Sequence, residues 1–129
     1  MKNYKKIFAA ILLTSIIVFN GFTAYAYPRF YFILRAGETK SSASEKKVDN
    51  LTGLVDLRSN NFISGEAANF RIRTATGAYA TEYRTLYGNA RVDLAYLSGM
   101  GVYGNYYRLY SNPEVIRISP LRVSGEWMP

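Results

Sequence analysis

The sequence predicts an all-β fold, a small antiparallel β-sandwich of six or seven strands that follows a cleaved signal helix. Apolar residues beyond residue 27 recur with a period of two, the spacing of a half-buried strand. Turn residues separate these runs at intervals of about 8 to 16 residues, as in sandwiches and barrels. The longest apolar run stands apart from this pattern, at the start of the chain.

Residues 1–26 have the three zones of a secretory signal peptide. Lys2, Lys5 and Lys6 precede an apolar run over residues 7–19, and Ala24-Tyr25-Ala26 gives the small-x-small pattern of a cleavage site. The run is shorter than the roughly 20 residues that span a bilayer. We therefore expect cleavage after Ala26 and a secreted, extracellular protein. The alternative is an uncleaved anchor over residues 7–27.

Residues 27–129 are expected to form a single secreted β-sandwich domain. Cleavage removes three of the sixteen basic residues and none of the nine acidic ones, so the formal charge falls from +7 to +4. The chain has no cysteine, so packing and hydrogen bonds must hold the domain together.

Two clear strands are predicted in the first half of this domain. In residues 28–35, Phe30, Phe32 and Leu34 share one face. Residues 67–74 alternate as well and set Arg71 and Arg73 on the outer face. A short strand is expected over residues 54–58. Residues 37–47 have no apolar anchor and are predicted to be a mobile loop.

The second half continues the period of two. Strands are expected over residues 91–97, 105–110, 115–119 and 121–127, with a bulge or edge crossing at Pro120. Tyr107 and Leu109 should face inward, whereas Tyr106, Arg108 and Tyr110 should face outward. The intervening segment, residues 79–87, is ambiguous, because Tyr79, Tyr83 and Leu86 have helix-like spacings although β-formers dominate. We favour strand or irregular structure there.

The composition argues against an enzyme. The chain has no histidine and no cysteine, which excludes imidazole bases, thiol nucleophiles and the usual ligands of zinc. Its nine carboxylates have no spacing that marks a catalytic pair, although a carboxylate hydrolase stays open as an alternative. We expect no catalytic residue, no metal and no cofactor.

A cluster of tyrosines is the positive signal. Four of the ten tyrosines beyond residue 26 lie within residues 103–110. Tyr103, Tyr106, Arg108 and Tyr110 are therefore the candidate surface for binding a sugar, a glycopeptide or a membrane interface. The alternative is that these tyrosines merely decorate a sheet, since tyrosine is a good strand former. A nucleic-acid partner is not expected for an exported protein.

The mature chain resembles a family of small secreted proteins of unknown function from Gram-positive bacteria. The resemblance rests on Phe30-x-Phe32, on Tyr107-Arg108-Leu109 and on the ending Val123-Ser124-Gly125-x-Trp127-x-Pro129. The layout is also similar to that of lactococcin-like bacteriocins, although this chain is longer and has fewer tryptophans. Neither resemblance supplies catalytic residues.

These observations together predict a secreted, non-enzymatic protein that acts by surface binding at the cell envelope. Its expected partner is a cell-wall polymer or an anionic membrane surface, because the charge is positive and aromatic side chains are abundant. A bacteriocin-like secreted toxin is the alternative.

Overall fold

The computed structural model describes residues 26–114 and 118–129. Within these ranges the chain is all-β, as predicted, and contains no helix that is long and apolar enough to cross a membrane. The nine strands of the described residues are β1 (Arg29–Leu34), β2 (Lys40–Ser41), β3 (Glu45–Lys46), β4 (Gly53–Asn60), β5 (Ala68–Thr74), β6 (Arg84–Leu86), β7 (Ala90–Leu94), β8 (Tyr106–Pro113) and β9 (Leu121–Met128). The predicted signal peptide lies outside the described residues except for Ala26, so its cleavage stays a prediction.

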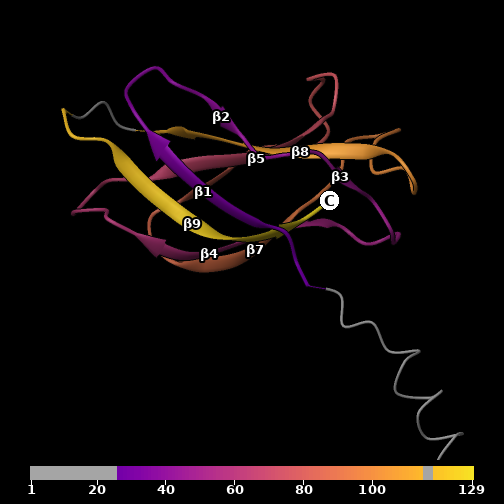
Figure 1. Cartoon of the computed structure of the whole chain (residues 1–129), viewed down its shortest axis with the longest axis horizontal. Helices are drawn as coiled ribbons and strands as arrows, with labels where there is room; N and C mark the ends of the chain where they lie inside the picture. Colours follow the sequence, from indigo (N-terminus) through magenta and orange to yellow (C-terminus); the bar gives the residue numbers. More distant parts are fainter. Residues whose placement is uncertain (1–25, 115–117) are drawn as a thin grey trace, which may run out of the picture.

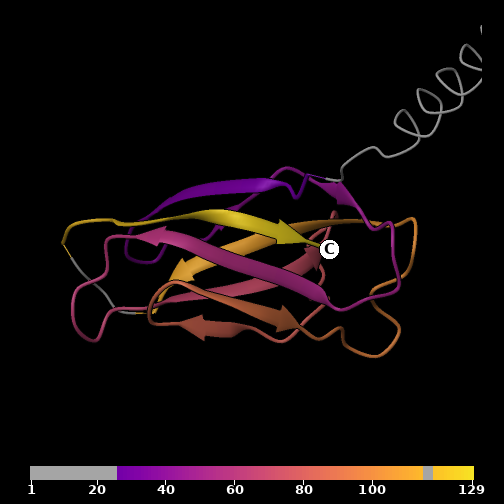
Figure 2. The same cartoon turned by 90° about the horizontal axis from the view of Figure 1, so that it is seen from below.

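The strands form two antiparallel sheets that pack face to face (Figures 1 and 2). The four-stranded sheet has the order β1-β9-β4-β7. The five-stranded sheet has the order β2-β8-β5-β6, and β3 pairs with β8 next to β2. The predicted small β-sandwich is confirmed.

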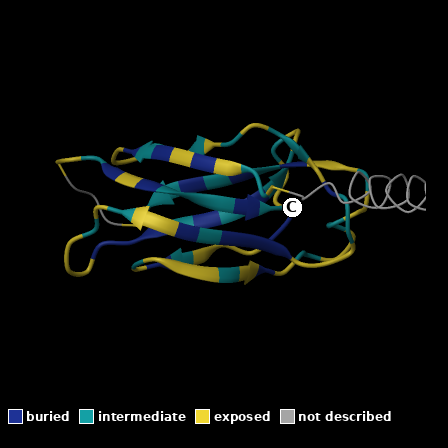
Figure 3. Ribbon diagram, turned by 60° about the horizontal axis from the view of Figure 1, so that its bottom comes forward, coloured by how far each residue is buried: buried dark blue, intermediate teal, exposed yellow. Residues whose placement is uncertain are grey.

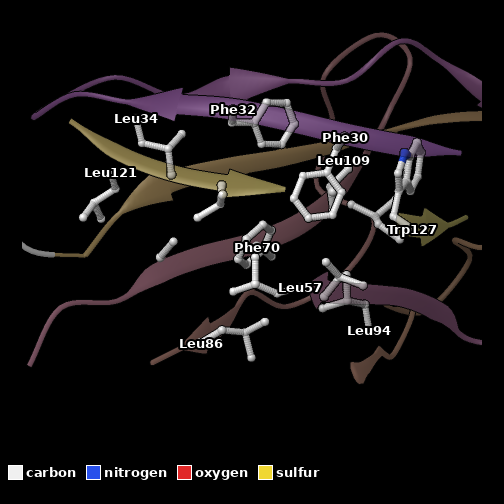
Figure 4. Packing of buried hydrophobic residues seen from close by; sticks show 14 of the residues in the cluster. Phe30, Phe32, Leu34, Leu57, Phe70, Leu86, Leu94, Leu109, Leu121 and Trp127 are labelled. Atoms are coloured by element: carbon white, nitrogen blue, oxygen red, sulfur yellow. The ribbon is translucent and has the colours of Figure 1, made fainter. Parts of the chain in front are cut away.

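Alternation along the strands builds the core between the sheets. Buried residues alternate with exposed or intermediate ones along β1 and β8. Figure 3 shows this alternation as bands of colour along the strands. Phe30, Phe32 and Leu34 from one sheet meet Phe70 and Leu109 from the other (Figure 4). The predicted inward faces of β1, β5 and β8 are therefore confirmed.

The segment of residues 37–47 is anchored to the fold, so the expectation that nothing anchors it is wrong. Its strands β2 and β3 both pair with the edge of β8. Lys47, at its end, is fully buried. The backbone N–H of Lys47 donates to Asn105 O (2.8 Å), and Gly104 N–H donates to Lys47 O (2.8 Å). Strands of two polar residues contain no alternation of apolar and polar residues, so the sequence did not predict them.

The predicted strand over residues 115–119 is not present in its described part. Residues 115–117 lie outside the described residues, and Ile118 and Ser119 form a bend in which Ile118 is fully exposed. Of the bulge or edge crossing expected at Pro120, the crossing is found, because Pro120 directly precedes β9 in the connection from the five-stranded to the four-stranded sheet. A bulge is found in β4, where the pairing with β9 shifts between Leu57 and Ser59.

The ambiguous segment, residues 79–87, is mostly irregular. It contains only the short strand β6, together with two isolated bridges. One bridge joins Tyr79 to Arg73, and the other joins Thr81 to Tyr96. The first of these brings the chain back alongside β5, where Ala80 N–H donates to Ile72 O (3.0 Å).

Candidate ligand-binding surface

The outer face of the five-stranded sheet gathers arginine and tyrosine side chains. Its central strands pair in a register that sets Arg71 opposite Tyr110 and Arg73 opposite Arg108. Their neighbours in sequence point into the core, because Ile72 is fully buried and strand residues alternate between faces. The rings of Tyr79 and Tyr83 cover Arg71 and Arg73. We call the surface formed by Arg71, Arg73, Arg108 and Tyr110, together with Tyr79 and Tyr83, the arginine-tyrosine face.

Two further tyrosines reach this face from the segment after β5. Tyr79 is bridged to Arg73 through the backbone, and Tyr83 follows four residues later. Both rings are more than half exposed. The turn that returns the chain is closed by Gly77 N–H donating to Thr74 O (2.9 Å), and Gly77 has a φ of 99°, which a residue with a Cβ rarely adopts.

Guanidinium groups and tyrosine rings stack alternately across the face. The Cζ atom of Arg71 lies 3.8 Å from the ring centroid of Tyr79 and 5.6 Å from that of Tyr83. The Cζ atom of Arg73 lies 4.8 Å from the centroid of Tyr79 and 4.3 Å from that of Tyr110. These distances are within the range of cation–π attraction, which holds the flat guanidinium groups in place.

The positive charge of this face is not compensated within the described residues. The four ion pairs found there involve only Lys40, Lys47 and Arg58 as cations. The Nε atoms of Arg71 and Arg73 are also shielded from solvent without a hydrogen-bond partner. An unpaired buried donor is costly, about 1–3 kcal/mol and more for a charged group. The two charges, without a carboxylate partner among the described residues, favour an anion on this face.

A cavity of about 310 Å³ opens on this face. Its lining includes Arg71, Arg73, Tyr79, Tyr83 and Tyr110. The lining also includes two amide side chains from the same strands, Asn69 of β5 and Asn112 of β8.

The two amides of the lining belong to a hydrogen-bond network. Asn69 Nδ2 donates to Asn112 Oδ1 (3.0 Å), and Thr85 Oγ1 donates to Asn69 Oδ1 (2.6 Å). A carboxylate, Glu114, accepts a further hydrogen bond from Asn69 Nδ2. These contacts fix the side chain of Asn69 at the rim of the cavity.

Another hollow, of about 450 Å³, lies on the four-stranded sheet beside Arg29, Tyr31 and Arg58. There the arginine charge is already balanced, because Arg58 pairs with Asp56 (3.0 Å) and Glu126 (3.3 Å). These contacts raise the pKa of Arg58, first through the hydrogen bond to Asp56. The charge of Arg58 therefore has less to gain from an anionic ligand.

The candidate residues from the sequence are divided between two places. Tyr106, Arg108 and Tyr110 point outward from β8 as predicted, and Tyr106 lies beside Lys46 of β3. Tyr103 is exposed in the turn before β8, which Asn105 N–H closes by donating to Val102 O (3.2 Å). Whether these four residues bind a ligand stays a prediction.

The sequence did not reveal the tyrosines that complete the cavity. Period-two alternation placed Arg71 and Arg73 on an outer face, but Tyr79 and Tyr83 lie in a segment without clear alternation. Backbone pairing of this segment with β5, including the bridge from Tyr79 to Arg73, brings them there. The described residues also contain no group of three or more metal-ligating side chains.

Comparison with protein-family models, with curated proteins and with solved structures gives no match for this chain.

Proposed function

We propose that this is a secreted, non-enzymatic protein that binds an anionic polymer of the cell envelope through its arginine-tyrosine face. The observation that carries the proposal is the stack of Arg71 and Arg73 on tyrosine rings, without a carboxylate partner among the described residues. Guanidinium groups recognise phosphate and carboxylate oxygens through paired N–H donors. Anionic wall polymers repeat such groups along their length.

The shape of the face supports an extended partner. Lys46, Tyr106, Arg108 and Arg73 follow one another across paired strands, so cationic and aromatic groups continue beyond the cavity. A polymer could contact several of these groups at once, and a small anion could not. The net charge of +4 expected after cleavage favours the approach of such a polymer.

Binding rather than catalysis is supported by the composition. The sequence lacks both histidine and cysteine, so the usual bases and nucleophiles of hydrolases are not present. Secretion is supported by the predicted signal peptide, residues 1–26.

The test is co-sedimentation of the purified protein with wall polymer, measured against anionic and neutral vesicles. Replacing Tyr106 and Tyr110 together by alanine, or Arg71 and Arg73 together by glutamine, should weaken polymer binding by about tenfold or more. Binding should also fall as the salt concentration rises. Equal binding by both double variants and the unmodified protein would refute the proposal.

Matched controls lie on the other sheet. Tyr31 of β1 is 60% exposed, and Arg122 of β9 is exposed as well. The Tyr31→Ala and Arg122→Gln variants change the same residue types without touching the arginine-tyrosine face, and they should bind polymer normally. Binding to anionic vesicles but not to polymer would replace the polymer by a membrane surface.

A bacteriocin-like toxin is the second proposal that the predicted export leaves open. It would inhibit the growth of related strains at low concentration. Polymer binding without any growth inhibition would favour the first proposal.

A further inference from the structure

We propose that the cavity on the arginine-tyrosine face binds one anionic sugar residue, a sugar ring that carries a carboxylate or a phosphate. This inference rests on the proposed function, because it names the unit of the polymer that the protein would recognise. Two features of the cavity carry it: a pair of stacked guanidinium groups and a set of tyrosine rings beside polar amides.

The anionic group is assigned from the way the guanidinium groups are held. Arg71 and Arg73 both lie over the ring of Tyr79, at 3.8 and 4.8 Å from its centroid. Stacking covers the flat faces of the two groups, and with the Nε atoms shielded, the terminal Nη atoms are left for hydrogen bonding. A ligand must therefore offer oxygen atoms in the guanidinium planes, as a carboxylate or a phosphate does.

Electrostatic repulsion points to the same ligand. Two like charges share one aromatic ring, and no ion pair relieves them within residues 26–114 and 118–129. An anion that contacts both groups would reduce this repulsion and would be attracted by both charges at once. A neutral sugar would neither reduce the repulsion nor be attracted by the two charges.

The sugar ring is assigned from the remaining lining. Tyr79 and Tyr83 are both more than half exposed, so their rings can receive the apolar C–H face of a sugar. Asn112 also lines the cavity, and its oxygen accepts a hydrogen bond from Asn69 Nδ2 (3.0 Å). Its amide nitrogen is then the group that can donate to a sugar hydroxyl.

The size of the cavity limits the ligand to one ring. Its volume of about 310 Å³ is at the lower end of the range of roughly 300–1,000 Å³ for small-molecule pockets. Longer polymers would extend beyond it along β8 towards Tyr106. The cavity thus recognises one sugar unit of the polymer, and the rest of the arginine-tyrosine face adds contacts to neighbouring units.

The experiment is a calorimetric or NMR titration of protein expressed from the full-length chain. The probes are glucuronic acid, glucose 1-phosphate, glucose and inorganic phosphate. Both anionic sugars should bind with a dissociation constant about tenfold lower than that of glucose or of phosphate alone, because each contacts both halves of the cavity. Equal binding of glucose and the anionic sugars would overturn the anionic assignment, and equal binding of phosphate and glucose 1-phosphate would overturn the sugar assignment.

The variants separate stacking from net charge. Arg73→Lys keeps the charge but loses the planar group, so it should weaken the binding of both anionic sugars by about tenfold, as Arg73→Gln does. Tyr79→Ala should do the same, and Tyr83→Ala, at a more distant ring, provides the test if Tyr79→Ala does not fold. Normal affinity in Arg73→Lys would overturn the inference, and the Tyr31→Ala control should retain normal affinity.

Failure of sugar binding in the cavity is distinguishable from failure of the proposed function. If wall polymer binds through the arginine-tyrosine face while neither anionic sugar binds, the inference is wrong and the proposed function stands. If neither the polymer nor the sugars bind, both are wrong.

Discussion

The side chain of Lys47 donates a hydrogen bond to the carbonyl oxygen of Pro129, 82 residues along the chain, over a distance of 3.2 Å. The same Nζ atom donates to Asp49 Oδ1 (3.1 Å) and to Leu51 O (2.6 Å), and it lies 4.8 Å from the ring centroid of Tyr96. One buried cation thus joins the segment before β4 to the end of β9.

Removing the charge of Lys47 should destabilise the fold. Lys47→Met keeps the apolar stem but leaves the Asp49 carboxylate and two carbonyl oxygens without their donor. Breaking a fully buried ion pair costs about 3–5 kcal/mol. Because the Asp49 side chain is 34% exposed, we expect a smaller loss, about 2–4 kcal/mol of unfolding free energy. The buried Trp127, the only tryptophan, reports urea unfolding by fluorescence.

Lys46 is the matched control for this prediction. It precedes Lys47 directly, belongs to β3 and is exposed. Lys46→Met should shift the unfolding midpoint little. Equal midpoints for the two variants would mean that the hydrogen bonds of Lys47 contribute nothing to stability.

The sequence predicted the parts of the fold that alternate. Phe30, Phe32 and Leu34 were assigned to the core because every second residue of a strand shares a face, and the structure buries all three. The strands β2 and β3 were missed because they form for a different reason. They provide hydrogen-bond partners for the backbone groups at the edge of β8, as where Ser42 N–H donates to Leu109 O (2.9 Å). No local sequence pattern indicates which segment will pair with that edge.

The glycine of the Gly-x-Trp ending, Gly125, has no room for a side chain, so its substitution should also lower the stability of the fold. A Cβ atom on Gly125 would overlap the carbonyl oxygen of Asp56 and would lie 3.1 Å from the backbone nitrogen of Arg58. These atoms are backbone at the bulge of β4, so they cannot swing aside. Gly125→Ala should therefore cost about 1–3 kcal/mol or more in unfolding free energy, measured by urea titration.

Gly88 supplies the comparison. A Cβ atom there would meet no heavy atom within 4 Å, and its φ is not positive. Gly88→Ala should leave stability close to that of the unmodified protein. A similar loss in both variants would show that lost chain flexibility, rather than crowding at Asp56, determines the effect.

The candidate site was only partly accessible from sequence. Alternation alone set Arg71 and Arg73 on the outer face of one strand, and Arg108 and Tyr110 on that of another. That these two strands are neighbours depends on long-range pairing between β5 and β8. The position of Tyr79 depends on how an irregular segment folds back beside β5. The periodicity of apolar residues does not predict the path of such a segment.

Alkaline pH should destabilise the protein through Tyr96. Burial, followed by the charges of Tyr107 and Asp49, raises the pKa of Tyr96 well above its usual value of 10.0. Above pH 10 the unfolded chain therefore releases this proton while the folded chain keeps it, so stability falls as the pH rises. In Tyr96→Phe this contribution disappears. The difference in unfolding free energy between pH 7 and pH about 11 should be smaller in the variant.

The same substitution gives a second readout at neutral pH. The hydroxyl of Tyr96 is buried without a hydrogen-bond partner in the described residues. Removing an unpaired buried hydroxyl costs nothing in hydrogen bonding, so Tyr96→Phe should be neutral or slightly stabilising at pH 7. A marked loss of stability at pH 7 would contradict the unpaired state of this hydroxyl.

The turn that carries Tyr103 should loosen when the hydroxyl of Tyr107 is removed. Tyr107 is buried, and its hydroxyl oxygen accepts a hydrogen bond from the backbone N–H of Val102 over 2.9 Å. Tyr107→Phe leaves this N–H without its acceptor, at a cost of about 1–3 kcal/mol. Hydrogen exchange at the amide of Val102 should accelerate, whereas the exposed Tyr106, changed to phenylalanine, should leave it unchanged. Unaltered exchange in Tyr107→Phe would mean that the turn is held by its backbone contacts alone, such as Gly104 N–H to Lys47 O.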